Sequence, residues 1–169
     1  MSLTATAVIQ SDISFTLVDN TNSSQSESSS LNYTRNLSNG TGVLQCNYGV
    51  IQSGVLPSGG DQFFDFTALE KNVLNLNANV NFSRIKGIIV ENRSTTLGYD
   101  INIHATGANA FDEIFNGESG NVLVKPYGSY IYTDAINGAV VDSSNRHLTL
   151  NDVSGSGANW TLVVVGVTG

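Results

Sequence analysis

Charged residues are scarce in this sequence. Only 12% of its 169 residues are charged, about half the share found in an average globular protein. Those that occur are mostly acidic, with 14 Asp and Glu against 7 Lys and Arg, and the formal net charge is −7. Because an acidic chain repels phosphate backbones, we expect no nucleic-acid partner.

Cysteine is almost absent, and long apolar runs do not occur. Cys46 is the only cysteine, which excludes an intrachain disulfide. We interpret it as a small buried residue of a strand, not as a nucleophile. The longest apolar runs, such as residues 88–90 and 163–165, are far shorter than the roughly 20 residues that cross a bilayer. The first residues also lack the features of a signal peptide. We therefore expect a soluble protein, made in a cytoplasm, with no membrane partner.

Helical periodicity is nearly absent too, whereas alternation of apolar and polar residues recurs along the chain. Residues 74–82 (LNLNANVNF) would place five apolar side chains on one face of a strand and four asparagines on the other. Residues 13–18 alternate in the same way, while residues 84–91 and 160–167 are apolar on both faces near their centres. The latter pattern predicts strands that are covered on two sides.

Further short strands are predicted at residues 63–66, 101–103, 122–126, 129–133, 139–141 and 148–150. Turn pairs such as Asn39-Gly40 and Asn137-Gly138 separate them at short intervals. Many short strands divided in this way are typical of an antiparallel β-sandwich or jelly roll. We predict one all-β domain over residues 1–169.

We make more specific predictions for three segments. Asn109 is a candidate cap for one short helical turn at residues 110–115, ended by Asn116-Gly117. Residues 20–30 (NTNSSQSESSS) have almost no apolar content, so we predict a mobile loop between the first two strands. Residues 1–19 are expected to form an N-terminal arm or additional strands.

Few residues invite a catalytic or metal-binding interpretation. Asp100, Asn102 and His104 would share one strand face, but metal sites need three or four converging ligands, so we interpret this row as a solvated polar face. His147 is interpreted as a surface residue. The 14 acidic residues are scattered, with no pair that marks a glycosidase.

Two glycine-containing segments are interpreted as turns. Residues 117–120 (GESG) do not match the G-x-S-x-G spacing of a nucleophile elbow. Residues 155–157 (GSG) lack the lysine of a phosphate loop and precede a strand. We predict no catalytic, cofactor-binding or metal-binding residue, and a protein that is not an enzyme.

Aromatic side chains leave one alternative of another class open. One of Tyr99, Tyr127, Tyr130, Tyr132 and Trp160 could be an exposed platform for sugar stacking, although core positions are the commoner role of such residues. That alternative would make the protein a carbohydrate-binding module.

From about residue 63 onwards, the sequence resembles the small jelly-roll-like virion proteins of tailed bacteriophages. The residues that carry the resemblance are 65–69 (DFTAL), 82–94 (FSRIKGIIVENRS), 107–111 (GANAF), 124–128 (VKPYG) and 160–166 (WTLVVVG). The chain departs from that pattern at residues 104–107 (HATG), where a Gly-Gly pair is common. It departs again at Tyr127, where a small turn residue is common. The first sixty residues lie outside the resemblance.

The resemblance implies a structural virion protein. Within that class, the expected role is a capsid decoration (cement) protein, a homotrimer bound to the major capsid protein on the outside of the phage head after synthesis in the bacterial host. A tail, baseplate or fibre-associated protein is the alternative within the class. Neither role implies a cofactor.

Overall fold

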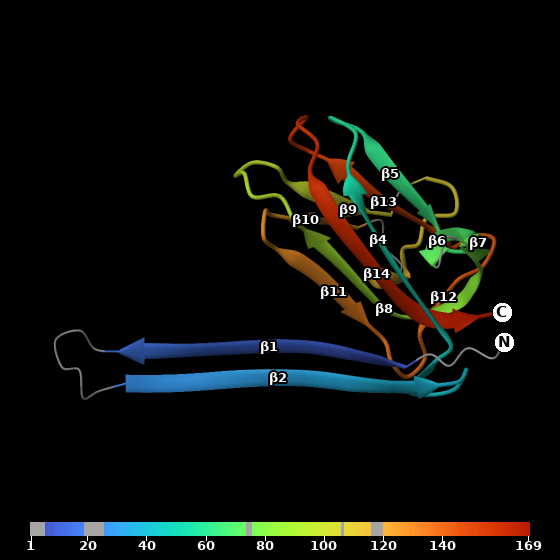
Figure 1. Cartoon of the computed structure of the whole chain (residues 1–169), viewed down its shortest axis with the longest axis horizontal. Helices are drawn as coiled ribbons and strands as arrows, with labels where there is room; N and C mark the ends of the chain where they lie inside the picture. Colours follow the sequence, from blue (N-terminus) through green and yellow to red (C-terminus); the bar gives the residue numbers. More distant parts are fainter. Residues whose placement is uncertain (1–5, 19–25, 74–75, 106, 116–119) are drawn as a thin grey trace.

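Two antiparallel β-sheets face each other across an apolar core, and a two-stranded arm projects from one end of them (Figure 1). The computed structural model describes residues 6–18, 26–73, 76–105, 107–115 and 120–169. Within strand residues 11–18, 26–33, 71–73 and 76–78, it describes the backbone alone. The predicted all-β, antiparallel sandwich is confirmed. No helix among these residues is long and apolar enough to span a bilayer.

The first sheet has the strand order β11-β8-β14-β4, with β12 beside the start of β8. Its strands are β4 (Tyr48–Val55), β8 (Phe82–Asn92), β11 (Ser129–Thr133), β12 (Ala139–Val140) and β14 (Asn159–Thr168). The second sheet has the order β10-β9-β13-β5. It contains β5 (Asp61–Asp65), β9 (Ile101–His104), β10 (Asn121–Val124) and β13 (His147–Asp152). β6 (Leu69–Val73) and β7 (Leu76–Val80) form a small separate hairpin.

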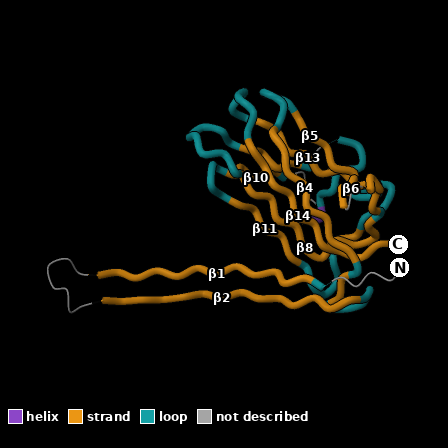
Figure 2. Tube along the Cα trace, in the orientation of Figure 1, coloured by secondary structure: helices purple, strands orange, loops and turns teal. Residues whose placement is uncertain are grey.

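The arm is made by the first two strands of the chain. β1 (Ala7–Val18) pairs antiparallel with β2 (Ser26–Asn39), and the end of β2 pairs in parallel with the short β3 (Gln45–Cys46). Figure 2 shows both strands leaving the sandwich side by side, while loops gather at the end of the sandwich furthest from the arm. Of residues 1–19, for which we expected an arm or extra strands, residues 7–18 form a strand of this arm, and residues 1–5 and 19 lie outside the described part.

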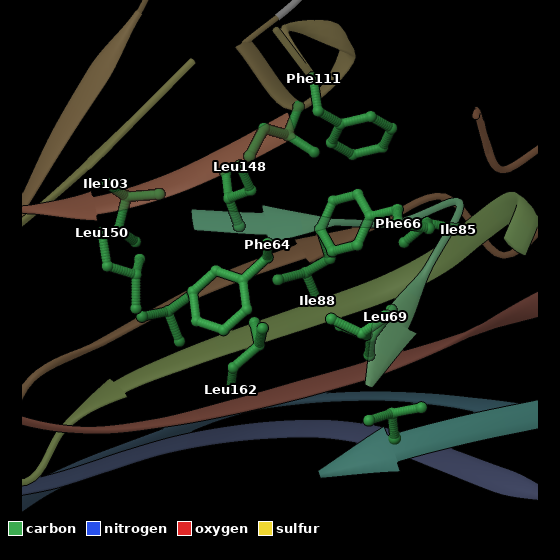
Figure 3. Packing of buried hydrophobic residues seen from close by; sticks show 14 of the residues in the cluster. Phe64, Phe66, Leu69, Ile85, Ile88, Ile103, Phe111, Leu148, Leu150 and Leu162 are labelled. Carbon is green, nitrogen blue, oxygen red and sulfur yellow. The ribbon is translucent and has the colours of Figure 1, made fainter. Parts of the chain in front are cut away.

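Alternating side chains from both sheets build the core. The inward residues of β9 and β13 are fully buried, as are Ile88 and Leu162 of the first sheet. Phe66 and Phe111 meet edge to face with ring centroids 4.9 Å apart (Figure 3). Trp160 lies in the same core, 5.2 Å from Phe64 in another edge-to-face pair. Offset and edge-to-face geometry is the favoured arrangement of aromatic rings.

The predicted strand over residues 74–82 is wrong in its extent. β7 ends at Val80 and β8 begins at Phe82, while residues 74–75 lie outside the described part of the chain. β7 pairs with β6, whereas β8 pairs with β14 and β11, so the chain changes partners at the exposed Asn81. Alternation continues across this change, which explains why the sequence suggested one strand.

The predicted loop over residues 20–30 is also too long. β2 begins at Ser26, so residues 26–30 pair with residues 14–18 of β1, and residues 19–25 lie outside the described part. Ladder hydrogen bonds use backbone groups, so a serine-rich segment can form a strand when its partner is fixed beside it.

The helical turn predicted over residues 110–115 is shorter in the structure, where it is one 3-10 turn at Glu113–Phe115. Asn109 is not its cap. It adopts a φ of 65°, a left-handed conformation that Asn tolerates better than most residues. Ala110 forms a bridge to His147, which holds the chain extended before the turn. The turn-ending pair expected at residues 116–117 lies outside the described part.

Candidate assembly surface

The arm is a long two-stranded ladder. Its register runs through twelve residue pairs, from Ala7 opposite Leu37 to Val18 opposite Ser26. At about 3.4 Å per residue, this ladder extends for roughly 40 Å. In Figure 1 the arm and the first sheet meet at the base of the arm and diverge from there. An isolated two-stranded hairpin is at best marginally stable in water, so contact with another surface would stabilise the far part of the arm.

The base of the arm is firmly seated on the sandwich. Ile9, Leu37, Cys46 and Ala135 form a small apolar cluster and are each at most 6% exposed. Gly87 of β8 makes room for this seat, because a Cβ at that position would lie 2.6 Å from Cδ1 of Ile9. The arm therefore sits on the outer face of the first sheet, at one end.

Backbone hydrogen bonds fix the same end of the arm. The Ser38 amide donates to the Leu44 carbonyl at 3.0 Å, and the Leu44 amide donates to the Ala135 carbonyl at 3.0 Å. Cys46 is buried, as predicted, and burial raises the pKa of its thiol. A neutral, buried thiol is a packing residue and not a reactive one.

The two faces of the arm differ in chemistry. Paired residues of an antiparallel ladder share a face, so the register places residues 13, 15, 17, 31 and 33 on the same face as Ile9 and Leu37. These five positions are occupied by Ile, Phe, Leu, Leu and Tyr, while Ser11, Glu27, Ser29 and Arg35 share the same face. The opposite face carries mostly Ser, Thr, Asn and Asp between residues 12 and 34. The arm is thus amphipathic, and its apolar face continues the face that is already buried at its base.

An apolar row crosses the outer face of the first sheet. The register aligns Ile131, Ile89, Val163 and Ile51 across β11, β8, β14 and β4. Ile51 is 72% exposed and Ile131 38% exposed, while the two central residues are half-buried. We call these four residues the apolar row. Because residues 84–91 and 160–167 are apolar on both faces, we predicted that these strands are covered on two sides. In the structure, the outer side of the apolar row instead remains accessible to solvent.

The outer face of the second sheet is different. Its outward register positions are mainly polar: Asp61, Asn102, His104, Asn121, Thr149 and Asn151. Phe63 and Leu123 are exceptions and are 64% and 46% exposed. An antiparallel sheet normally has one buried face and one solvated, polar face. The second sheet follows this rule at most positions, although Thr149 is only 2% exposed, whereas the apolar row breaks it.

The predicted polar row on β9 does not gather into a metal site. Asp100 forms an ion pair with Lys125, with 2.6 Å between Oδ2 and Nζ. Asn102 and His104 are half-buried on β9. Among the described residues, no three His, Cys, Asp or Glu side chains come together in a way that could hold a metal ion.

His147 lies at the start of β13 beside Asp65 and Arg146. Its Nε2 is 3.4 Å from Oδ2 of Asp65, and its Nδ1 is 3.3 Å from the Ala108 carbonyl. Burial alone would raise the pKa of Asp65, but hydrogen bonds from Thr67 and the charge of Arg146 outweigh it and lower that pKa. His147 is half-buried, so it is less exposed than the surface residue that we expected.

The remaining residues that the sequence analysis considered as functional candidates are described next. Residues 155–157 form part of a turn, as predicted, while residues 116–119 lie outside the described part. Trp160 is 6% exposed and Tyr99, Tyr130 and Tyr132 are half-buried against the core. Tyr127 alone of the five aromatic candidates is largely exposed, at 74%.

Neither the apolar row nor the direction of the arm was predicted from the sequence. The apolar row comes from four strands that are distant in the chain, so no local pattern unites its members. The only signal was the excess apolar character of β8 and β14. The amphipathic pattern of residues 13–18 was visible, but the direction of the arm was not.

No family model matches the chain, and no curated protein matches it. Among solved structures, the chain has a likeness to a mitogen derived from Yersinia pseudotuberculosis. The sequences are 11% identical, the match covers 70% of this chain and 86% of that one, and the TM-score is 0.37.

Proposed function

We propose that this protein is a structural component of a bacteriophage virion, a capsid decoration protein that binds the outside of the head as a homotrimer. The arm is the observation that supports this role. It leaves the sandwich with an apolar face beyond its seat, as expected of an element that becomes covered on assembly. The proposed role involves no catalysis and no cofactor.

Low charge is consistent with assembly. Charged side chains, particularly lysine, are a common protection of sheet edges against unwanted pairing, and β4 and β11 are edge strands with no Lys, Arg, Asp or Glu. Closed rotational symmetry would cover such edges with identical surfaces of other copies. Repeated binding to a capsid lattice would then add many weak contacts in parallel. The resemblance from residue 63 onwards points to the same class of protein.

The test is to mix purified protein with expanded phage capsids and image them. We expect density at capsomer three-fold positions. A matched variant replaces residues 11–33 by Asn-Gly, a favoured two-residue turn, between Gln10 and Thr34. It keeps the buried residues Ile9 and Leu37, so it should fold but leave capsids undecorated. Density in the tail alone would support the tail-protein alternative, and a protein absent from virions would refute the proposal.

Tyr127 supports a second candidate function, that of a carbohydrate-binding module. The residue is 74% exposed and lies in the turn between β10 and β11. A glycan array would test this candidate: binding that is lost in Tyr127→Ala and kept in Tyr127→Phe would support sugar stacking. Equal binding by Tyr127→Ala would contradict it.

A further inference from the structure

We propose that the arm of one copy lies across the apolar row of the next copy, with its apolar face against Ile131, Ile89, Val163 and Ile51. This inference rests on the self-assembly part of the proposed function and names the surfaces that would meet. The occupant of the row is thus a second copy of this chain.

The seat of the arm shows that the two surfaces are compatible. At the base, Ile9 already lies on Gly87 and next to Val165, on the outer face of the first sheet. Gly87 pairs with Val165 one row away from Ile89, which pairs with Val163. The apolar row therefore adjoins an existing contact between this arm and this sheet face, and the apolar residues of a second arm would extend that contact.

The arm of the same copy does not serve as the cover. From the seat onward, β1 and β2 run away from β11, β8 and β14 (Figure 1), and Ile51 keeps 72% of its surface exposed. The apolar row of one subunit is thus left without a cover by its own arm. Its chemistry matches that of the apolar residues that the register places along the arm of a neighbouring copy.

This pairing is head-to-tail, because an arm meets a sheet face and not another arm. Head-to-tail contacts generate closed rings when the rotation between subunits closes. Every subunit then gives one arm and receives one, so both surfaces are covered throughout. A trimer is the ring that the proposed function expects.

A pair of matched variants tests the row. Ile51 and Phe63 both lie on edge strands and are similarly exposed, at 72% and 64%, but on opposite sheets. Ile51→Glu would place a charge in the proposed contact, so we expect association weakened on the order of tenfold or more. Phe63→Glu should leave the oligomer unchanged. Because both side chains are exposed, both variants should fold, and light scattering after gel filtration measures the molar mass.

Disulfide trapping tests the arm directly. In a Cys46→Ala background, Phe15→Cys combined with Ile51→Cys should form a disulfide between chains, seen as a ladder on a non-reducing gel. Thr16→Cys with Ile51→Cys is the control, because the register places Thr16 on the opposite face of the arm.

The outcomes separate this inference from the proposed function. A wild-type protein that is monomeric at every concentration overturns the inference. So does an oligomer that survives Ile51→Glu and shows no trapping from residue 15. Capsid decoration without such trapping would overturn the inference alone, whereas a trapped ring that never binds capsids would refute the proposed function alone.

Discussion

Asp152 offers the sharpest test of what stabilises the sandwich. The residue is 2% exposed and lies at the end of β13, where the chain leaves the second sheet. Oδ2 accepts hydrogen bonds from the amides of Gly59 and Gly157 at 2.9 and 2.8 Å, and Oδ1 accepts two more from Ser154. One ionised side chain thus holds two loops together.

The pKa of Asp152 gives the size of the effect. Burial alone would raise it, but the four hydrogen bonds outweigh burial and lower the pKa from 3.8 to about 2. This difference is equivalent to about 2 kcal/mol of stability. Because the pKa is lower in the folded state, the contribution is present above the unfolded pKa. It is lost as the pH falls from about 5 to 2.

The perturbation is Asp152→Asn, measured by urea denaturation between pH 7 and pH 2. At pH 7 we expect a loss of about 2–3 kcal/mol in the free energy of unfolding, because the amide group cannot accept all four hydrogen bonds. The difference between wild type and variant should then shrink by about 2 kcal/mol towards pH 2. Other carboxylates are common to both proteins, so they cancel in this comparison.

Asp142 provides the control. Hydrogen bonds from Ser144 and Asn145 also lower its pKa, but the residue is exposed. Asp142→Asn should therefore cost much less stability than Asp152→Asn. A constant difference between wild type and Asp152→Asn from pH 7 to pH 2 would refute the reasoning, since the carboxylate charge would then contribute nothing.

Two further predictions concern other buried residues. Asn92 is fully buried at the end of β8, and its Nδ2 donates to the carbonyls of Tyr99, in the loop before β9, and of Val124 in β10. Asn92→Ala should lower the free energy of unfolding by about 2–4 kcal/mol in urea denaturation, since two carbonyls lose their donor, and a loss below about 1 kcal/mol would contradict this role. Cys46 should react with iodoacetamide only after denaturant unfolds the protein, and rapid labelling of the native protein at neutral pH would show that the seat of the arm opens.

The sequence by itself determined the class of fold. Alternation in residues 101–103 and 148–150 predicted strands with one buried face, because successive side chains of a strand point to opposite sides whatever its partners are. The segments became β9 and β13, with these isoleucines and leucines fully buried. The sequence predicted the strand boundaries less well. The serine-rich residues 26–30 belong to β2, because pairing with a fixed partner strand outweighs their weak local preference for strand structure.

Only the tertiary structure decided which residues meet. Asp152 is an ordinary acidic residue in the sequence, and its donors at Gly59 and Gly157 become neighbours only when two loops pack together. The apolar row likewise exists only because four distant strands align in one register. The path of the arm depends on Gly87, whose missing side chain admits Ile9. Such contacts join residues far apart in the chain, and a pattern of neighbouring residues carries no record of them.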